Sequence, residues 1–259
     1  MLGMLLMLPL LTWAQNKVNA SEVIAKINRG EAIAYKNAEI TGDLDLAKLQ
    51  NMKLKDRKGE SKYETKEYIS TVTAPISFVN CTFKGDVLAY FNPDNGVNIV
   101  SSRNEVYNTN FEKDVRFDNC TFEKASAFKY SVFDGDVSFV GSAFKEEALF
   151  KYSKFRGTVD FSKARFRQDA NFKYVTFPGK ANFAGATFGG EANFKYAKFE
   201  EGVDYQKANF DGIANFKYAK ISDSFNIKGA SFKGDDDFKY TRLNNRQVSL
   251  TTLLEMNRQ

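Results

Sequence analysis

The sequence contains no histidine, and it has only two cysteines, four prolines and one tryptophan among its 259 residues. Without histidine, the protein lacks the side chain that most often transfers protons near neutral pH and the imidazole that many metal sites use as a ligand. Its Asp and Glu residues show no spacing typical of a paired catalytic site or a metal-ligand set, and no nucleophile stands in a recognisable catalytic motif. We therefore expect a protein that is not an enzyme and that uses neither a metal nor a cofactor.

A large excess of charge of one sign is also missing. The chain carries 37 Lys and Arg against 32 Asp and Glu, a formal net charge of +5. A dedicated binder of nucleic acid is usually more strongly basic, so nucleic acid is not an expected partner. The mixture of both signs is typical of a soluble surface.

One short apolar run stands at the N-terminus, MLGMLLMLPLLTWA at residues 1–14. It is shorter than the ~20 apolar residues that a membrane-spanning helix needs. An apolar segment that ends at a small residue, here Ala14, is typical of a signal peptide, although no Lys or Arg precedes it. We expect residues 1–14 to be a signal peptide and the protein to be exported, periplasmic or extracellular; a plain hydrophobic terminus is the alternative.

The two cysteines occur in matching contexts, VNCTF around Cys81 and DNCTF around Cys120. Free cysteine is among the most frequently buried residues, so both are expected to fill small, equivalent positions in the core. Export would place them in an oxidising compartment. A disulfide between them is an open alternative, and it requires a specific geometry.

Phenylalanine is abundant, with 25 residues, and it recurs at regular intervals. From Phe117 to Leu243 the large apolar residues follow alternating steps of five and six, and the tripeptide FKY begins at 128, 150, 172, 194, 216 and 238. No face of an α-helix has this period. A small or β-branched residue stands two positions before most of the large ones, so both point the same way in a short strand. Four such strands make a 22-residue coil of a solenoid, with each FKY above the last.

The units ANFKY (170–174 and 192–196), ANFAG (181–185), ANFDG (208–212) and ASFKG (230–234) resemble those of pentapeptide-repeat proteins. The resemblance covers about residues 106–243, with weaker traces at 38–49 and 76–88. It implies an all-β fold, a right-handed quadrilateral β-helix. This chain departs from the family pattern by a sixth residue in alternate units, for which we expect small bulges at the corners. Some relatives mimic DNA and bind topoisomerases, but that role favours an acidic surface and a cytoplasmic protein.

The domain organisation follows from where the period starts and breaks. We expect an N-terminal capping helix within residues 15–32, with Ser21 as its N-cap. The β-helix is expected over residues 33–248, with insertions near 50–74 and 89–105 and an external loop at 53–68. Phe78 and Phe117 hold equivalent places 39 residues apart, which makes the second insertion 17 residues long. Insertions in solenoids often serve the binding face, so this one is a candidate for specificity. Residues 249–259 are a C-terminal cap or tail.

Each FKY has one residue for the core and two for the surface. The Phe is expected inside, and the Lys and Tyr outside in stacked rows. One interpretation is that the Lys stems cover an aromatic corner while their ammonium groups stay hydrated. The other is a strip that binds an anionic polymer. The candidate strip comprises Lys129, Lys151, Lys173, Lys195, Lys217 and Lys239, with Tyr152, Tyr174, Tyr196 and Tyr218.

These observations predict a non-catalytic, exported β-helical scaffold or protein-interaction module. The expected partner is a protein whose identity the sequence does not give. The alternative function is a binding module for an anionic glycan or a membrane surface, through the stacked Lys and Tyr side chains. The sequence leaves the oligomeric state open.

Overall fold

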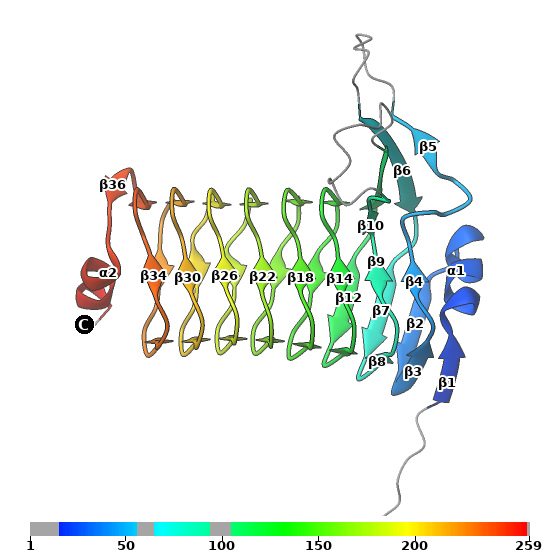
Figure 1. The fold of residues 1–259 in the computed structure, drawn as a ribbon, viewed down its shortest axis with the longest axis horizontal. Helices are drawn as coiled ribbons and strands as arrows, with labels where there is room; N and C mark the ends of the chain where they lie inside the picture. Colours follow the sequence, from blue (N-terminus) through cyan, green and yellow to red (C-terminus); the bar gives the residue numbers. More distant parts are fainter. Residues whose placement is uncertain (1–15, 56–64, 94–104, 258–259) are drawn as a thin grey trace, which may run out of the picture.

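The computed structural model describes residues 16–55, 65–93 and 105–257. Its coils stack along one axis, with a helix at each end and a small sheet that projects near the N-terminal end (Figure 1). The predicted signal peptide, residues 1–14, lies outside the described residues. No helix in the described segments is long and apolar enough to cross a membrane.

The strands of the described segments form four sheets, which we call sides one to four in the order in which the chain reaches them from β2 onward. Side one contains β2 (Ile33–Lys36), β7 (Ile76–Val79), β12 (Val115–Asp118), β16 (Val137–Ser138), β20 (Val159–Asp160), β24 (Ala181–Asn182), β28 (Val203–Asp204) and β32 (Phe225–Asn226). Side two contains β1 (Asn16–Asn19), β3 (Ala38–Thr41), β8 (Thr82–Phe83), β13 (Thr121–Phe122), β17 (Ala143–Phe144), β21 (Arg165–Phe166), β25 (Thr187–Phe188), β29 (Asn209–Phe210) and β33 (Ser231–Phe232).

Side three contains β4 (Leu44–Asp45), β9 (Val87–Leu88), β14 (Ser126–Ala127), β18 (Ala148–Leu149), β22 (Ala170–Asn171), β26 (Ala192–Asn193), β30 (Ala214–Asn215) and β34 (Asp236–Asp237). Side four contains β5 (Lys53–Leu54), β6 (Lys66–Val72), β10 (Tyr90–Phe91), β11 (Glu105–Phe111), β15 (Val132–Phe133), β19 (Lys154–Phe155), β23 (Thr176–Phe177), β27 (Lys198–Phe199), β31 (Lys220–Ile221), β35 (Arg242–Leu243) and β36 (Arg246–Gln247). The chain thus turns through four sides in each coil, which confirms the predicted four-sided solenoid.

Successive coils pair in parallel with a constant offset. Ala148 pairs with Ala170, and Ala170 with Ala192, each step being 22 residues. Phe117 pairs with Phe78, which confirms the equivalence inferred across the second insertion. In the regular coils each strand therefore stacks on its counterpart in the preceding coil.

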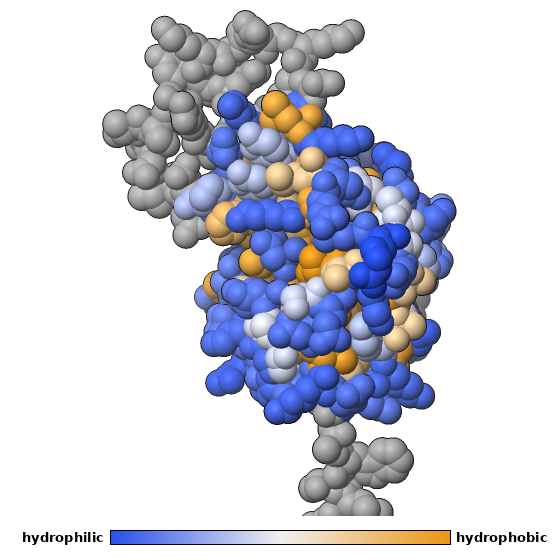
Figure 2. All heavy atoms as spheres, turned by 90° about the vertical axis from the view of Figure 1, so that its right-hand side faces the viewer, coloured by the Kyte–Doolittle hydropathy of each residue, from blue (hydrophilic) through white to orange (hydrophobic). Residues whose placement is uncertain are grey.

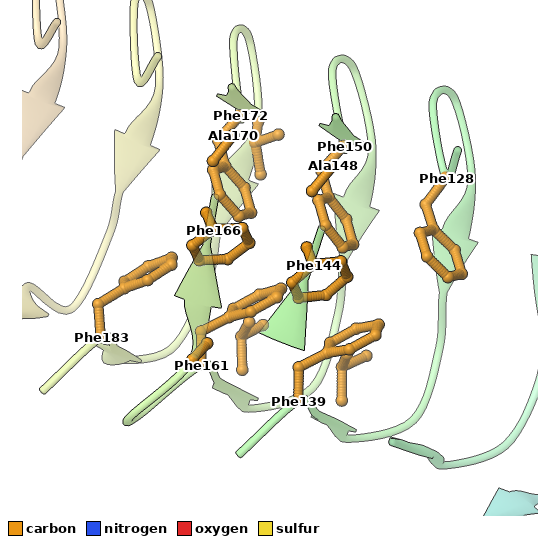
Figure 3. Close-up of a cluster of buried hydrophobic side chains, with 14 of the residues drawn as sticks. Phe128, Phe139, Phe144, Ala148, Phe150, Phe161, Phe166, Ala170, Phe172 and Phe183 are labelled. Atoms are coloured by element: carbon orange, nitrogen blue, oxygen red, sulfur yellow. The ribbon is translucent and has the colours of Figure 1, made fainter. Parts of the chain in front are cut away.

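The core consists of aromatic columns that run along the axis. The rings of Phe128, Phe150, Phe172, Phe194, Phe216 and Phe238 stack with centroids 4.9–5.1 Å apart. A second column crosses them edge to face, as where Phe161 meets Phe172 at 5.2 Å and 80° (Figure 3). Burial of each ring contributes about 1.5–3 kcal/mol, and well-oriented ring pairs add about 0.5–1.5 kcal/mol. The interior is therefore filled by side chains.

Two kinds of corner alternate around each coil. Between sides three and four, and between sides one and two, the chain makes a β-turn whose third residue has positive φ, for example Tyr152 at 63° and Lys163 at 58°. Ser153 N–H donates to the Phe150 carbonyl oxygen at 3.0 Å and closes one such turn. The other two corners lie between sides two and three and between sides four and one. Each is a bend of three residues and contains the extra residue of the six-residue units. Gly212 lies in one of these, where a Cβ would stand 2.2 Å from the Gly190 carbonyl oxygen of the preceding coil.

The two ends of the coil are covered by helices α1 (Ala20–Asn28) and α2 (Leu250–Met256). The prediction of Ser21 as the N-cap of α1 was wrong: Asn19 is the N-cap, and its Oδ1 accepts a hydrogen bond from Ser21 N–H at 2.9 Å. The segment from residue 15 also does not begin as helix, because Asn16–Asn19 form β1 and pair with β3. Seen from the end that α1 covers, the surface is mostly hydrophilic, with separate hydrophobic patches (Figure 2).

Part of the segment predicted as an external loop, 53–68, is strand instead. β5 and β6 pair antiparallel, β6 and β11 pair in parallel over seven residues, and β10 flanks β11. The first residues of β6 and β11 extend beyond the corner between sides three and four. We call this projecting sheet, made of β5, β10 and the first halves of β6 and β11, the flange (Figure 1).

Candidate functional site

The corner between sides three and four carries every FKY tripeptide. Phe enters the core, Lys is the second residue of the β-turn and Tyr the third, with φ between 60° and 64° from Tyr130 to Tyr240. In the last four of these turns the residue before Phe accepts a hydrogen bond from the Lys backbone: Asn171 Oδ1 accepts from Lys173 N–H at 3.3 Å, and Asp237 Oδ1 accepts from Lys239 N–H at 3.0 Å. The Asn, Phe, Lys and Tyr of ANFKY thus each occupy a position in or beside the turn that suits the side chain.

Tyrosine is an unusual residue for a backbone with positive φ, which glycine and asparagine adopt more readily. Stacking of the rings on each other offsets this preference. The stack comprises Tyr130, Tyr152, Tyr174, Tyr196, Tyr218 and Tyr240, with centroids 4.7–5.1 Å apart.

The lysines lie over the tyrosine that follows them. The Nζ atoms of Lys129, Lys151, Lys173, Lys195 and Lys239 lie 4.9–5.5 Å from the ring centroid of the next residue. Lys217 instead makes an ion pair with Asp237, at 3.4 Å. All these lysines except the exposed Lys239 are half-buried. We call the six Lys and six Tyr side chains the Lys–Tyr corner; it contains all ten residues that the sequence predicted for a binding strip.

The electrostatic environment of the Lys–Tyr corner is basic. Burial, followed by the charges of Lys173 and Lys129, lowers the pKa of Lys151 from its ordinary value. A second row of exposed cations runs beside it on side four: Lys154, Lys198, Lys220 and Arg242. The corner between sides two and three differs, because ion pairs link its coils, such as Lys145 to Glu123 at 3.1 Å and Lys233 to Asp211 at 2.8 Å.

At its N-terminal end the Lys–Tyr corner meets the flange. Lys129 Nζ donates to the Tyr90 hydroxyl at 3.1 Å, and the rings of Tyr90 and Tyr130 lie 5.9 Å apart. A cavity of about 340 Å³ opens there, lined among the described residues by Thr65, Glu67, Tyr90, Asn92, Val106, Lys129 and Tyr130. The sequence analysis did not single out Glu67 or Tyr90. The sequence signal that could have identified them is that the two insertions interrupt the repeat at the same corner of consecutive coils.

The remaining candidate chemistry is limited. In the described segments no group of three or more Cys, Asp or Glu side chains is placed to hold a metal ion. Cys81 and Cys120 are free and buried, in equivalent places of adjacent coils. The structure therefore does not contain the disulfide that the sequence left open as an alternative. Both cysteines fill the core as expected.

Comparison with known proteins gives one match. A family model described as pentapeptide repeats (nine copies) matches residues 107–154, 150–198 and 194–242, which together span more than half of the chain. No curated protein and no solved structure matches it. The matched residues are the coils that build the aromatic columns and the Lys–Tyr corner. The chain belongs to the pentapeptide-repeat family.

Proposed function

We propose that this protein is an exported, non-catalytic β-helical scaffold that binds a protein partner along the Lys–Tyr corner. The pentapeptide-repeat β-helix is generally a non-enzymatic fold. The observation that carries the proposal is the row of stacked Tyr and Lys side chains, held at fixed spacing by the aromatic core beneath. Preorganised side chains lose little entropy on binding.

The chemistry of the Lys–Tyr corner suits a protein with an acidic surface. Tyrosine is enriched among the residues that contribute most to protein interfaces, and Tyr130, Tyr174 and Tyr240 are exposed. The adjacent lysines would attract acidic groups and speed association. The flange extends this surface at one end, as insertions in solenoids often do.

Site-specific photo-crosslinking tests the proposal. A benzoyl-phenylalanine residue at Lys195, on the Lys–Tyr corner, should capture a discrete partner in the native host. The matched control is Gln206, an exposed residue at the second position of the equivalent turn between sides one and two. Capture from both positions alike, or from Gln206 alone, would contradict the assignment of this corner.

Export is a separate part of the proposal, supported by the apolar segment at residues 1–14. The protein isolated from its host should begin at Gln15 and fractionate outside the cytoplasm. N-terminal sequencing that finds the apolar segment intact on cytoplasmic protein would reject this part alone.

A second candidate function is binding of an anionic glycan or a membrane surface. The observation that favours it is the excess of cations at the Lys–Tyr corner, in contrast to the ion-paired corner between sides two and three. Changing Lys151, Lys173, Lys195 and Lys217 together to Gln should then abolish salt-sensitive retention on heparin and anionic vesicles. Equal behaviour of wild type and variant at low salt would leave the protein partner as the sole candidate.

A further inference from the structure

We propose that the cavity between the flange and the first turn of the Lys–Tyr corner is a binding site for a short, uncharged saccharide. This site is separate from the surface proposed for the protein partner and does not depend on it. Three features of the described residues support it: how the cavity is built, the pair of rings that walls it, and the balance of its polar groups.

The cavity exists because two insertions depart from the repeat at one corner. In later coils the chain passes from side three to side four by a β-turn, as at Lys129 and Tyr130. In the two preceding coils the chain leaves the solenoid at this place and returns through β6 and β11. A solenoid stabilised by stacking of its coils does not need the flange, so the cavity that Glu67 of β6, Tyr90 of β10 and Val106 of β11 help to line is an addition to the fold.

Two aromatic rings form one wall of the cavity. Tyr90 comes from the flange and Tyr130 from the first FKY turn, and their planes are tilted by 57°. The C–H groups of a sugar ring pack on aromatic faces, and tyrosine adds a hydroxyl at the edge of its apolar ring. Tilted rings of this kind fit the side of a small ring-shaped ligand.

The charged groups of the cavity are held in place by other side chains. Lys129 Nζ lies 4.6 Å from the centroid of the Tyr90 ring and donates to its hydroxyl at 3.1 Å. The Glu67 carboxylate accepts from Lys55 Nζ at 2.9 Å and from Asn108 Nδ2 at 3.0 Å. Groups fixed in this way can orient a ligand without a large loss of side-chain entropy.

The charge and size of the cavity select the ligand class. Among the described residues that line the cavity, the charged groups are the ammonium of Lys129 and the carboxylate of Glu67, which face the same space. An anion would meet the carboxylate, a cation would meet the ammonium, and an apolar ligand would cover both charges without adding a hydrogen bond to either. A neutral ligand rich in hydroxyl groups can donate to Glu67 and accept from Lys129. A volume of about 340 Å³ is near the lower end for ligand pockets, which suits a short saccharide.

Calorimetric titration and saturation-transfer NMR of the whole chain test this assignment, with glucose, N-acetylglucosamine, maltotriose, cellotriose and chitotriose as probes. At least one probe should bind. Tyr130→Gly, which suits the positive φ at this position, should weaken that binding at least about tenfold, equal to about 1.4 kcal/mol. Tyr174→Gly is the matched control, because it removes the same residue from the same turn two coils away, and it should bind as wild type.

Glu67→Gln provides an independent readout that leaves both rings in place. It removes the carboxylate acceptor, so it should weaken binding of the same probe while circular dichroism stays unchanged. The assignment is overturned if no saccharide probe binds up to about 10 mM. It is equally overturned if Tyr130→Gly and Tyr174→Gly bind alike, or if heparin binds in the cavity in place of the uncharged probes.

Discussion

The ring of Tyr174 lies flat against the ring of Tyr196, with centroids 4.7 Å apart and planes 3° apart. Both residues have positive φ, a conformation that costs a non-glycine residue about 1–3 kcal/mol. Each inner ring of the stack has a neighbour above and below, and each contact contributes about 0.5–1.5 kcal/mol. The tyrosines therefore stabilise a turn that their own backbone preference opposes.

Tyr174→Gly and Lys163→Gly separate these two effects. Both residues have positive φ, at 60° and 58°, but Lys163 belongs to the corner between sides one and two and has no ring stack. We expect Tyr174→Gly to lower the free energy of unfolding by about 1 kcal/mol relative to Lys163→Gly, because it loses two ring contacts. Denaturant unfolding measures the difference. Equal stabilities would mean that the stack contributes nothing.

Tyr205 occupies a core position that Phe183 fills in the preceding coil and Ile227 in the following one. Its hydroxyl is buried and has no hydrogen-bond partner, and burial raises its pKa well above the ordinary value. Tyr205→Phe should therefore raise the free energy of unfolding by about 1 kcal/mol. The reciprocal change in the same column, Phe183→Tyr, should lower it. A Tyr205→Phe variant less stable than wild type would show that the hydroxyl forms a hydrogen bond in solution.

Cys81 and Cys120 should be unreactive in the folded protein. The neighbouring Cys81 thiol, followed by burial, raises the pKa of Cys120, whose Sγ donates to the Phe78 carbonyl oxygen at 3.4 Å, whereas the Cys120 thiol lowers the pKa of Cys81 to about 7. Both cysteines are only 1% exposed, so a thiol reagent should modify neither in the native state and both after unfolding, when each can form the reactive thiolate in contact with solvent. Rapid labelling of the native protein, or no labelling of the unfolded protein without reductant, would contradict this.

Tyr107 in the flange should make stability depend on alkaline pH. Its hydroxyl donates to Glu105 Oε2 at 2.8 Å, and this hydrogen bond, with burial and the Glu105 charge, raises its pKa from 10.0 to about 12. The folded state keeps a proton that the unfolded state loses, so this stabilisation is present below pH 10 and is lost as pH rises to about 12. Unfolding at several pH values should show a smaller alkaline loss in Tyr107→Phe. An equal loss of stability at alkaline pH in the variant and in wild type would contradict the raised pKa of Tyr107.

The periodic part of the molecule was predictable because each Phe position repeats at 22 residues and tolerates no other register. The side-chain directions at Phe172 and Lys173 follow from that period alone. Positive φ at Tyr174 was not predictable, since its local preference is opposite and the conformation depends on the turn and on stacking between coils. The flange was missed because β5 and β6 pair with each other outside the repeat, so the period carries no information about them. β1 was missed because its pairing with β3 depends on contact between coils.

The interpretation of the Lys–Tyr corner depends on the division of each FKY between core and surface. Phe172 is fully buried between Phe150 and Phe194, while Lys173 lies over the ring of Tyr174 at the surface. An Asp at position 172 would be an unpaired charge among stacked rings, whereas an Asp at 173 would stand beside Lys151 and Lys195.

Unfolding of Phe172→Asp and Lys173→Asp by denaturant, side by side with wild type, tests this division most directly. We expect Phe172→Asp to lose about 4 kcal/mol or more, the scale of removing a buried ring, and Lys173→Asp to change by less than about 1 kcal/mol. Equal losses in the two variants, or a larger loss in Lys173→Asp, would contradict the assignment of Phe to the core and Lys to the binding surface.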